Sequence, residues 1–279
     1  MWVFCQPLTD GLFRNKNKKR TFDDEGLHMP EQQSNPLIDL RARIARLERG
    51  ETDAGRYPAM PFDIPAIDAA LPGGGLASGA VHEVTGSAAG GFVSMLAGRA
   101  DGPVLWCVMA RFGADLYGPG LAAFGLDTDR LVIARCATAE DMLWAMEEGL
   151  RDPGVAAVVG EPDRAVALTA SRRLQLAAET GGGTGLVLRR GAGKGDLSPS
   201  AVFSRWQAES APLLGLPGMA RTAIGGTRWR LELLRCRGGV GGMNKAWLVE
   251  WCDATRDFSL VSDIGDRSGA AREGQRLAG

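Results

Sequence analysis

Hydrophobic residues fall in short, nearly continuous runs along the middle of the chain. The runs cover residues 80–86, 103–109, 130–136, 155–160 and 184–190. Helix-compatible stretches lie between later runs, at 139–152 and 167–180. Strands that are apolar throughout and separated by helices are typical of a parallel sheet covered on both faces. The pattern therefore predicts an α/β fold built on a mostly parallel sheet.

Beyond residue 198 the pattern changes to an alternation of apolar and polar positions. Three such segments, 200–210, 227–239 and 245–253, follow one another without long helices between them. Alternation with period two indicates strands with one buried face. We therefore expect antiparallel strands that extend or cap the sheet. The folded domain is expected to cover residues 51–261, followed by a flexible polar tail at 262–279.

The N-terminal part of the chain divides into an extension and a helix. Residues 1–34 hold three of the five lysines, and we expect a disordered basic arm or a mis-annotated extension with translation starting at Met29. Residues 35–50 predict a helix, because Asn35 can cap it and Pro36 suits its first turn. Its apolar stripe is a candidate docking surface for a partner, formed by Leu37, Leu40, Ile44 and Leu47.

Composition narrows the class of protein. The five cysteines are scattered without a C-x-x-C pair, which favours a reducing cytoplasm and predicts no metal site. No apolar stretch reaches the roughly 18 residues of a membrane span. We therefore expect a cytoplasmic protein that makes no membrane contact and carries no cofactor.

The net charge of −1 conceals two opposite poles. Residues 51–163 carry six basic and 16 acidic side chains, whereas residues 164–240 carry 12 basic and four acidic ones. The two segments either neutralise each other in the fold or leave a basic face for nucleic acid or an acidic protein. The candidate contacts for such a ligand flank the segment after the fifth apolar run, and they are Arg189, Arg190, Lys194 and Arg205.

A glycine-rich segment, VTGSAAGGFV, follows the first apolar run. Gly86 and Gly91 have the G-x-x-x-x-G spacing of a phosphate-binding loop between a strand and a helix. The next two positions should be Lys and Ser or Thr, which neutralise phosphates and bind magnesium. Here they are Phe92 and Val93, which can do neither. The segment therefore has the frame of a nucleotide loop without its chemistry.

The surrounding sequence resembles RecA-type recombinases. The approach FDIPAIDAALPGGGLASGAVHEVTG (62–86) and the segment at 124–163 resemble the RecA segments before the phosphate loop and around the magnesium-associated carboxylate. The resemblance implies that Glu161 occupies that carboxylate position. It places the general base near Ala110, yet no acidic residue occurs from Pro103 to Ala114. We therefore expect a RecA-like sheet with a degenerate nucleotide site.

A closer resemblance covers residues 36–262. LPGGGLASGAVHEVTG, SAVFSRWQAESAP and RWRLELLRCRGG with KAWLVEW are similar to the ImuA family, the RecA-like component of a damage-inducible mutagenesis cassette in bacteria. The resemblance implies a non-enzymatic adaptor in SOS-induced translesion DNA synthesis. Its implied partners are ImuB, a Y-family polymerase homologue, together with an error-prone replicative polymerase paralogue and RecA. We favour the C-terminal strands, with Trp229 and Trp247, as the docking element.

Two other functions remain open at this point. The chain could be an ATPase that uses a displaced cation such as Arg99 or Arg111, or a SulA-like inhibitor of a division or recombination protein. Two features have a simpler structural interpretation. Tryptophans at alternating strand positions usually pack in a core, and His82 and Glu83, as neighbours in a strand, point to opposite faces and do not form an acid–base pair.

Overall fold

The computed structural model describes residues 57–112, 116–190, 198–211, 227–238, 245–252 and 254–264. Its helices are α2 (Pro65–Asp68), α3 (Ala89–Arg99), α4 (Gly118–Ala123), α5 (Ala139–Arg151) and α6 (Leu168–Gly181), with 3-10 turns η1 (Pro72–Gly74), η2 (Ala110–Phe112) and η3 (Thr128–Arg130). Its strands are β1 (Ala59–Met60), β2 (Leu76–Ala77), β3 (Val81–Thr85), β4 (Val104–Met109), β5 (Leu131–Cys136), β6 (Ala157–Gly160), β7 (Thr184–Arg189), β8 (Ser204–Ala211), β9 (Arg228–Cys236), β10 (Lys245–Cys252) and β11 (Asp257–Ile264). The predicted runs and helices therefore form the expected elements, with ends that differ by at most two residues except at β8, which begins at Ser204, and at β9, which ends at Cys236.

The main sheet has nine strands in the order β11-β10-β9-β8-β3-β7-β6-β4-β5. Strands β8, β3, β7, β6, β4 and β5 run parallel to their neighbours within this group. Strands β9, β10 and β11 continue the sheet with antiparallel pairing. The prediction of a mostly parallel sheet with an antiparallel extension is confirmed, although β8 itself pairs parallel to β3.

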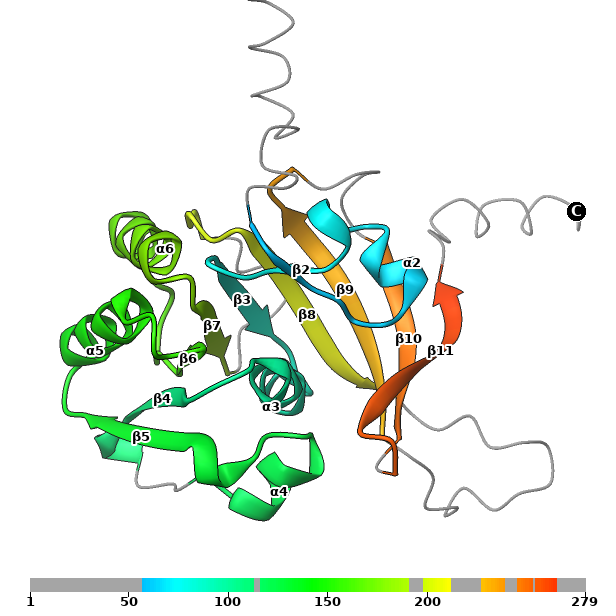
Figure 1. Ribbon diagram of the computed structural model, residues 1–279, viewed down its shortest axis with the longest axis horizontal. Helices are drawn as coiled ribbons and strands as arrows, with labels where there is room; N and C mark the ends of the chain where they lie inside the picture. The colour runs from blue at the N-terminus through cyan, green and yellow to red at the C-terminus, as the bar shows by residue number, and fades with distance from the viewer. Residues whose placement is uncertain are drawn as a thin grey trace, which may run out of the picture. The chain divides into compact units, whose positions relative to one another are not determined.

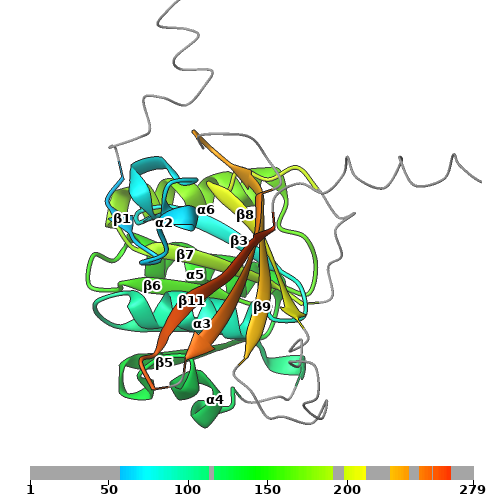
Figure 2. The ribbon, with the colours of Figure 1, turned by 90° about the vertical axis from the view of Figure 1, so that its right-hand side faces the viewer.

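Helices cover both faces of the parallel part of the sheet, as Figures 1 and 2 show. Helix α3 packs on one face, while α5 and α6 pack on the other. Each face has its own apolar cluster, one around Phe92 and the other around Met146 and Leu174. The two-sided cover explains why β3, β6 and β7 are buried along their whole length.

Local sequence signals fix the ends of the helices. Thr138 and Asp141 form a reciprocal capping box at the start of α5. Helix α6 ends at Gly181, and the next residue, Gly182, has a left-handed backbone with φ of 84°. Among the described residues, no helix has the length and apolar character that crossing a membrane requires.

The antiparallel strands contribute to the core of the α3 face. Trp229, Trp247 and Trp251 are each at most 2% exposed and belong to the same cluster as Phe92. The edge-to-face contacts of Phe258 with Trp229 and Trp251 tie β11 to this cluster. The prediction that Trp229 and Trp247 dock a partner is therefore wrong, because both side chains are buried in the core.

The limits of the described residues affect several predictions. Strand β11 ends at Ile264, three residues beyond the predicted end of the folded domain. The predicted extension at 1–34 and the predicted helix at 35–50, with its leucine stripe, lie outside the described residues. The same holds for residues 265–279 and for Lys194.

Candidate functional site

The glycine loop lies between β3 and α3, where the sequence predicts it. Gly86 has a φ of 106°, and a Cβ atom there would lie 2.2 Å from the backbone oxygen of Ala208 in β8. Both the left-handed backbone and this close approach require glycine. Helix α3 already begins at Ala89. In the strand–loop–helix phosphate motif the helix follows the second glycine, so this loop is shorter than its sequence spacing suggests.

Two backbone amides of this loop donate hydrogen bonds to strand β8. The Ser87 amide donates to Glu209 Oε2 at 3.1 Å, and the Ser87 hydroxyl donates to the same oxygen at 2.6 Å. The Ala88 amide donates to the Ala208 carbonyl at 3.0 Å. Amides in this position are the ones that bind phosphate oxygens in a nucleotide loop. Here a carboxylate and a carbonyl of the same chain accept their hydrogen bonds.

Phe92 and Val93 are fully buried beneath this loop. The Phe92 ring lies 5.8 Å from the Trp206 ring and 6.2 Å from the Trp229 ring, in edge-to-face geometry with both. A Cβ on Gly91 would lie 2.7 Å from the Trp229 ring. The aromatic core therefore fills the volume directly behind the loop, and the positions of the expected Lys and Ser or Thr are packing positions.

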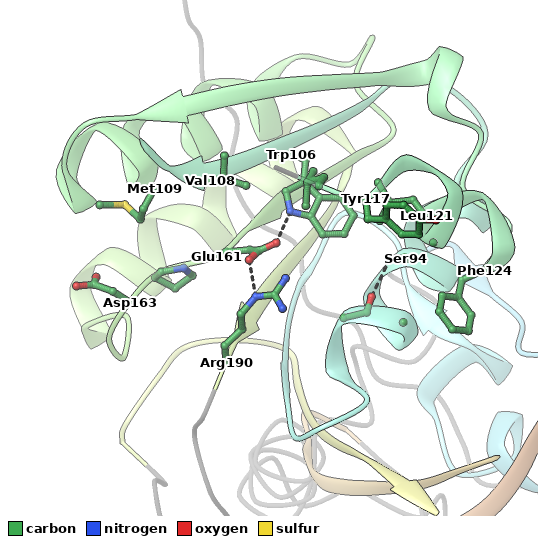
Figure 3. A pocket seen from close by; sticks show the side chains of 15 residues that line it. Ser94, Trp106, Val108, Met109, Tyr117, Leu121, Phe124, Glu161, Asp163 and Arg190 are labelled. Atoms are coloured by element: carbon green, nitrogen blue, oxygen red, sulfur yellow. Dashed lines mark hydrogen bonds and ion pairs between the residues drawn. The ribbon is translucent and has the colours of Figure 1, made fainter. Parts of the chain in front are cut away.

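Glu161 follows β6, where the resemblance places a carboxylate (Figure 3). Its two oxygens accept hydrogen bonds at 2.7 Å, one from Trp106 Nε1 and the other from Arg190 Nε. The Glu161 carboxylate raises the pKa of the Arg190 guanidinium above its usual value. Both oxygens of Glu161 are thus engaged by side chains of the protein.

A cavity of about 630 Å³ opens beside Glu161, at the carboxyl ends of β4, β6 and β7. Its walls come from the N-terminal turns of α3, from β4, from α4 and from the segment after β6. The lining is mostly apolar, with Trp106, Val108, Met109, Tyr117, Leu121 and Phe124 (Figure 3). At its rim Asp163 pairs with Arg111, whose hydrogen bond holds the pKa of the Asp163 carboxyl below its usual value.

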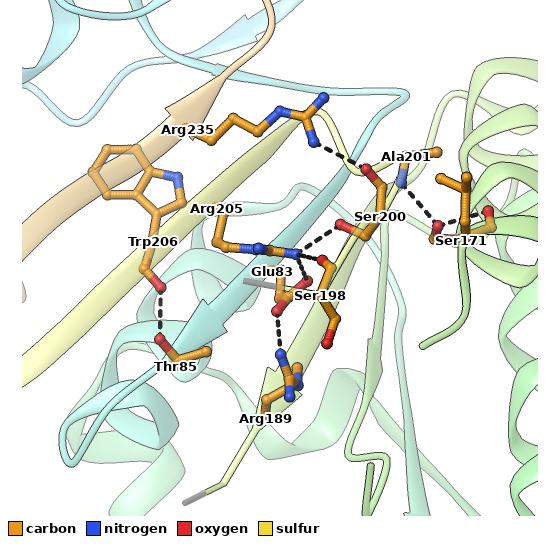
Figure 4. A network of polar contacts seen from close by, with 11 residues as sticks. Glu83, Thr85, Ser171, Arg189, Ser198, Ser200, Ala201, Arg205, Trp206 and Arg235 are labelled. Carbon is orange, nitrogen blue, oxygen red and sulfur yellow. Dashed lines mark hydrogen bonds and ion pairs between the residues drawn. The ribbon is translucent and has the colours of Figure 1, made fainter. Parts of the chain in front are cut away.

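Two of the predicted nucleic-acid contacts lie inside the fold (Figure 4). Arg189 and Arg205 are each 5% exposed, and they flank Glu83 on the neighbouring strand. Arg189 pairs with one Glu83 oxygen at 2.9 Å, and Arg205 pairs with the other at 3.1 Å. Buried charges need such partners. The prediction that these two arginines form an exposed contact is therefore wrong, whereas Arg190 is exposed.

His82 and Glu83 point to opposite faces, as the strand geometry predicts. His82 Nε2 donates to the Ala77 carbonyl at 2.8 Å, and His82 Nδ1 lies 2.6 Å from the Ser204 hydroxyl. Burial lowers the pKa of His82 to about 4. Neither ring nitrogen is near the cavity lining, so His82 has a packing role.

Sequence reasoning missed the residues that close the loop. Glu209 lies 122 positions from Ser87, and only its alternation with Arg205 and Gln207 in β8 indicated that it faces the same side as they do. It also missed Tyr117 and Leu121, because the segment between β4 and β5 carried no recognisable pattern. Only the fold brings Tyr117 and Leu121 beside Glu161.

The arrangement defines a class of protein before it defines a family. A mostly parallel sheet with a glycine loop after a central strand, and with a carboxylate at the end of a neighbouring strand, is that of a RecA-like α/β protein. Two curated proteins named Protein ImuA, from Caulobacter vibrioides strains NA1000 and CB 15, are each 41% identical to this chain over 244 residues. The alignment covers 80% of this chain and 96% of each relative. The chain therefore belongs to the ImuA family. No family model matches it.

Proposed function

We propose that this protein is a non-enzymatic RecA-like adaptor of SOS-induced, error-prone translesion DNA synthesis, and that it binds an ImuB-like polymerase homologue. Membership of the ImuA family supports a part in a DNA-damage mutagenesis cassette. The adaptor role goes further, and its support comes from the glycine loop. A RecA-like protein that does not hydrolyse nucleotide can contribute binding surfaces to such a cassette but no catalytic activity.

The observation behind this proposal is the hydrogen bond that the Ser87 amide donates to the Glu209 carboxylate. A nucleotide phosphate would have to displace Glu209 from Ser87 and Ala208 from Ala88 before it could reach these donors. It would also meet the negative charge of Glu209 with no lysine beside it, because Phe92 is buried among aromatic rings. The negative charges of Glu209 and a neighbouring phosphate would repel each other, and hydrogen bonds from amides alone would give a phosphate little binding energy without a cation. We therefore infer that the nucleotide site is degenerate.

The alternative of a displaced cation finds little support in the geometry. Arg99 is the last residue of α3, about 15 Å along the helix from its first turn. Its guanidinium pairs with Asp63 and Asp257 at that end. Arg111 pairs with Asp163 at the cavity rim. Neither cation stands beside the loop amides.

Further partners of the adaptor are part of the proposal. An error-prone replicative polymerase paralogue and RecA are the candidates that the family resemblance implies. Contact with DNA would involve Arg190, whose side chain is 66% exposed, together with Lys194. Replacement of both by alanine should then flatten the salt dependence of DNA binding, because fewer counterions are released.

Copurification with the ImuB-like protein tests the proposed function. Both full-length chains should be co-expressed, and the complex measured by size exclusion without nucleotide and with MgATP. We expect one stable complex whose yield is the same in both conditions. A complex that forms only with MgATP would support the ATPase alternative. Absence of any complex, with a division protein captured from DNA-damaged cells instead, would support the SulA-like alternative.

A further inference from the structure

The cavity beside Glu161 has walls suited to apolar side chains. Trp106 and Leu121 are buried in its walls, and Tyr117 at its edge is 73% exposed. Its volume of about 630 Å³ falls within the roughly 300–1,000 Å³ of ordinary ligand sites. A large exposed aromatic side chain beside an apolar hollow is typical of a protein–protein anchor site.

Two polar side chains inside the cavity are already engaged. The Ser94 hydroxyl donates to the Gly90 carbonyl at 2.8 Å, and Trp106 Nε1 donates to Glu161. These donors are therefore not available to phosphate or sugar oxygens, which need several hydrogen bonds each. An apolar group, in contrast, requires none. The interior thus favours hydrocarbon over a polar ligand.

One cation at the cavity still has donors to offer. A guanidinium carries five N–H groups, and Arg190 uses its Nε–H for Glu161 while its side chain is 66% exposed. The Glu161 bond fixes the orientation of the guanidinium, as Figure 3 shows. A pre-oriented guanidinium binds a second carboxylate with charge-assisted hydrogen bonds. The two carboxylates of the lining, Glu161 and Asp163, are already paired with Arg190 and Arg111. The lining therefore combines an apolar hollow with a site for one further negative group, at the exposed N–H groups of Arg190.

We propose that this cavity binds an acidic peptide segment of a partner protein. A large apolar side chain of that segment, aromatic or leucine, enters between Tyr117 and Leu121, and a neighbouring carboxylate pairs with Arg190. This inference deepens the proposed adaptor function and rests on it, because it names the surface that holds the partner. It assigns docking to the carboxyl edge of the parallel strands and not to the C-terminal strands.

A labelled peptide tests the chemistry of the cavity directly. The probe is a fluorescein-labelled hexapeptide of two aspartates, phenylalanine, leucine and two glutamates, titrated with the full chain by fluorescence anisotropy. Tyr117→Ala should weaken binding by roughly tenfold or more, as for an interface anchor. Arg190→Gln should weaken binding of this probe but not of the same peptide with amides in place of its carboxylates. Trp144→Ala, which removes another exposed aromatic side chain, should have no effect.

The same variants, measured with the ImuB-like protein, separate the inference from the proposed function. If wild-type chain binds this partner and Tyr117→Ala binds it equally well, the cavity inference is overturned and the adaptor function stands. If the peptide binds in the cavity but the ImuB-like protein does not bind at all, the proposed function fails. No binding of the peptide to wild-type chain, or its displacement by a single-stranded oligonucleotide, also overturns the inference.

Discussion

At the scale of single residues, the loop between β3 and α3 is tightly constrained. Gly86 combines a positive φ with a backbone oxygen 2.2 Å from any added Cβ. Gly90, four residues later in α3, has nothing within 4 Å of the same atom. The two glycines thus form a matched pair, one required by the fold and one not.

Substitution of these glycines should separate the two cases. Gly86→Ala should lower the free energy of unfolding by about 2–4 kcal/mol, because alanine disfavours this φ and β8 must move away. Gly90→Ala should be neutral or raise it by up to about 1 kcal/mol, because alanine favours helix. Urea denaturation measures both. Equal effects of the two substitutions would contradict the close packing of β8 on the loop.

His82 is a second residue whose environment can be measured. Its Nε2 donates to a carbonyl and its Nδ1 faces the Ser204 hydroxyl, which also accepts from Trp206 Nε1. This chain of donors suits the neutral ring, in agreement with a pKa lowered by burial to about 4. The imidazole of His82 therefore binds a proton less readily in the folded protein than in the unfolded chain.

The pH dependence of stability follows from that pKa. Because the pKa of His82 in the folded protein, about 4, lies below the ordinary histidine pKa of 6.5, the unfolded chain binds more protons between these two pH values. The contribution is fully present above about pH 6.5 and is lost on acidification toward pH 4, by roughly 3 kcal/mol. His82→Gln should remove this part of the pH dependence. His28→Gln, which changes the other histidine of the chain, should retain it.

At the scale of elements, the parallel strands and helices could be predicted well from the sequence. Apolar runs of strand length and helix caps such as Thr138 are local signals, and the structure reproduces them. Burial of charged strand residues could not be predicted equally well. Arg189 and Arg205 looked exposed because charged residues usually are. Their burial depends on Glu83 from a strand 106 and 122 positions away, which no local pattern reveals.

The antiparallel strands show the same limit. Their alternation was visible, but their role in the core depends on packing against α3 and not on their own pattern. The loop closure by Glu209 is likewise a contact between distant segments. The sequence therefore showed that Phe92 and Val93 stand where a nucleotide loop has Lys and Ser or Thr, but it did not show which group binds the loop amides.

Tryptophan substitutions test the structural role of strand β10. Trp247→Ala removes a side chain that is 1% exposed and should cost about 3–5 kcal/mol of unfolding free energy. Trp144→Ala is the same chemical change on the exposed face of α5, at 64% exposure, and should stay within about 0.5 kcal/mol. Thermal denaturation of both variants compares them. A tolerated Trp247→Ala would return β10 to the candidate docking elements.

At the scale of the whole molecule, the protein combines a RecA-like sheet with a loop that its own strand β8 occupies. Contacts that a nucleotide would make are replaced by Glu209 and Ala208 on the loop amides. Apolar packing around Phe92 replaces the charged part of the site. Contacts within the chain therefore hold β3, α3 and β8 together without a nucleotide, and we propose that the carboxyl edge of the sheet binds a partner.

Calorimetric titration of the full-length chain with MgATP, combined with an assay of phosphate release, tests this account most directly. We predict no heat of binding at micromolar nucleotide concentrations and no turnover above background, because strand β8 binds the Ser87 and Ala88 amides and Phe92 stands in place of the lysine. Micromolar affinity for MgATP, or phosphate release that Glu161→Ala abolishes, would contradict the account.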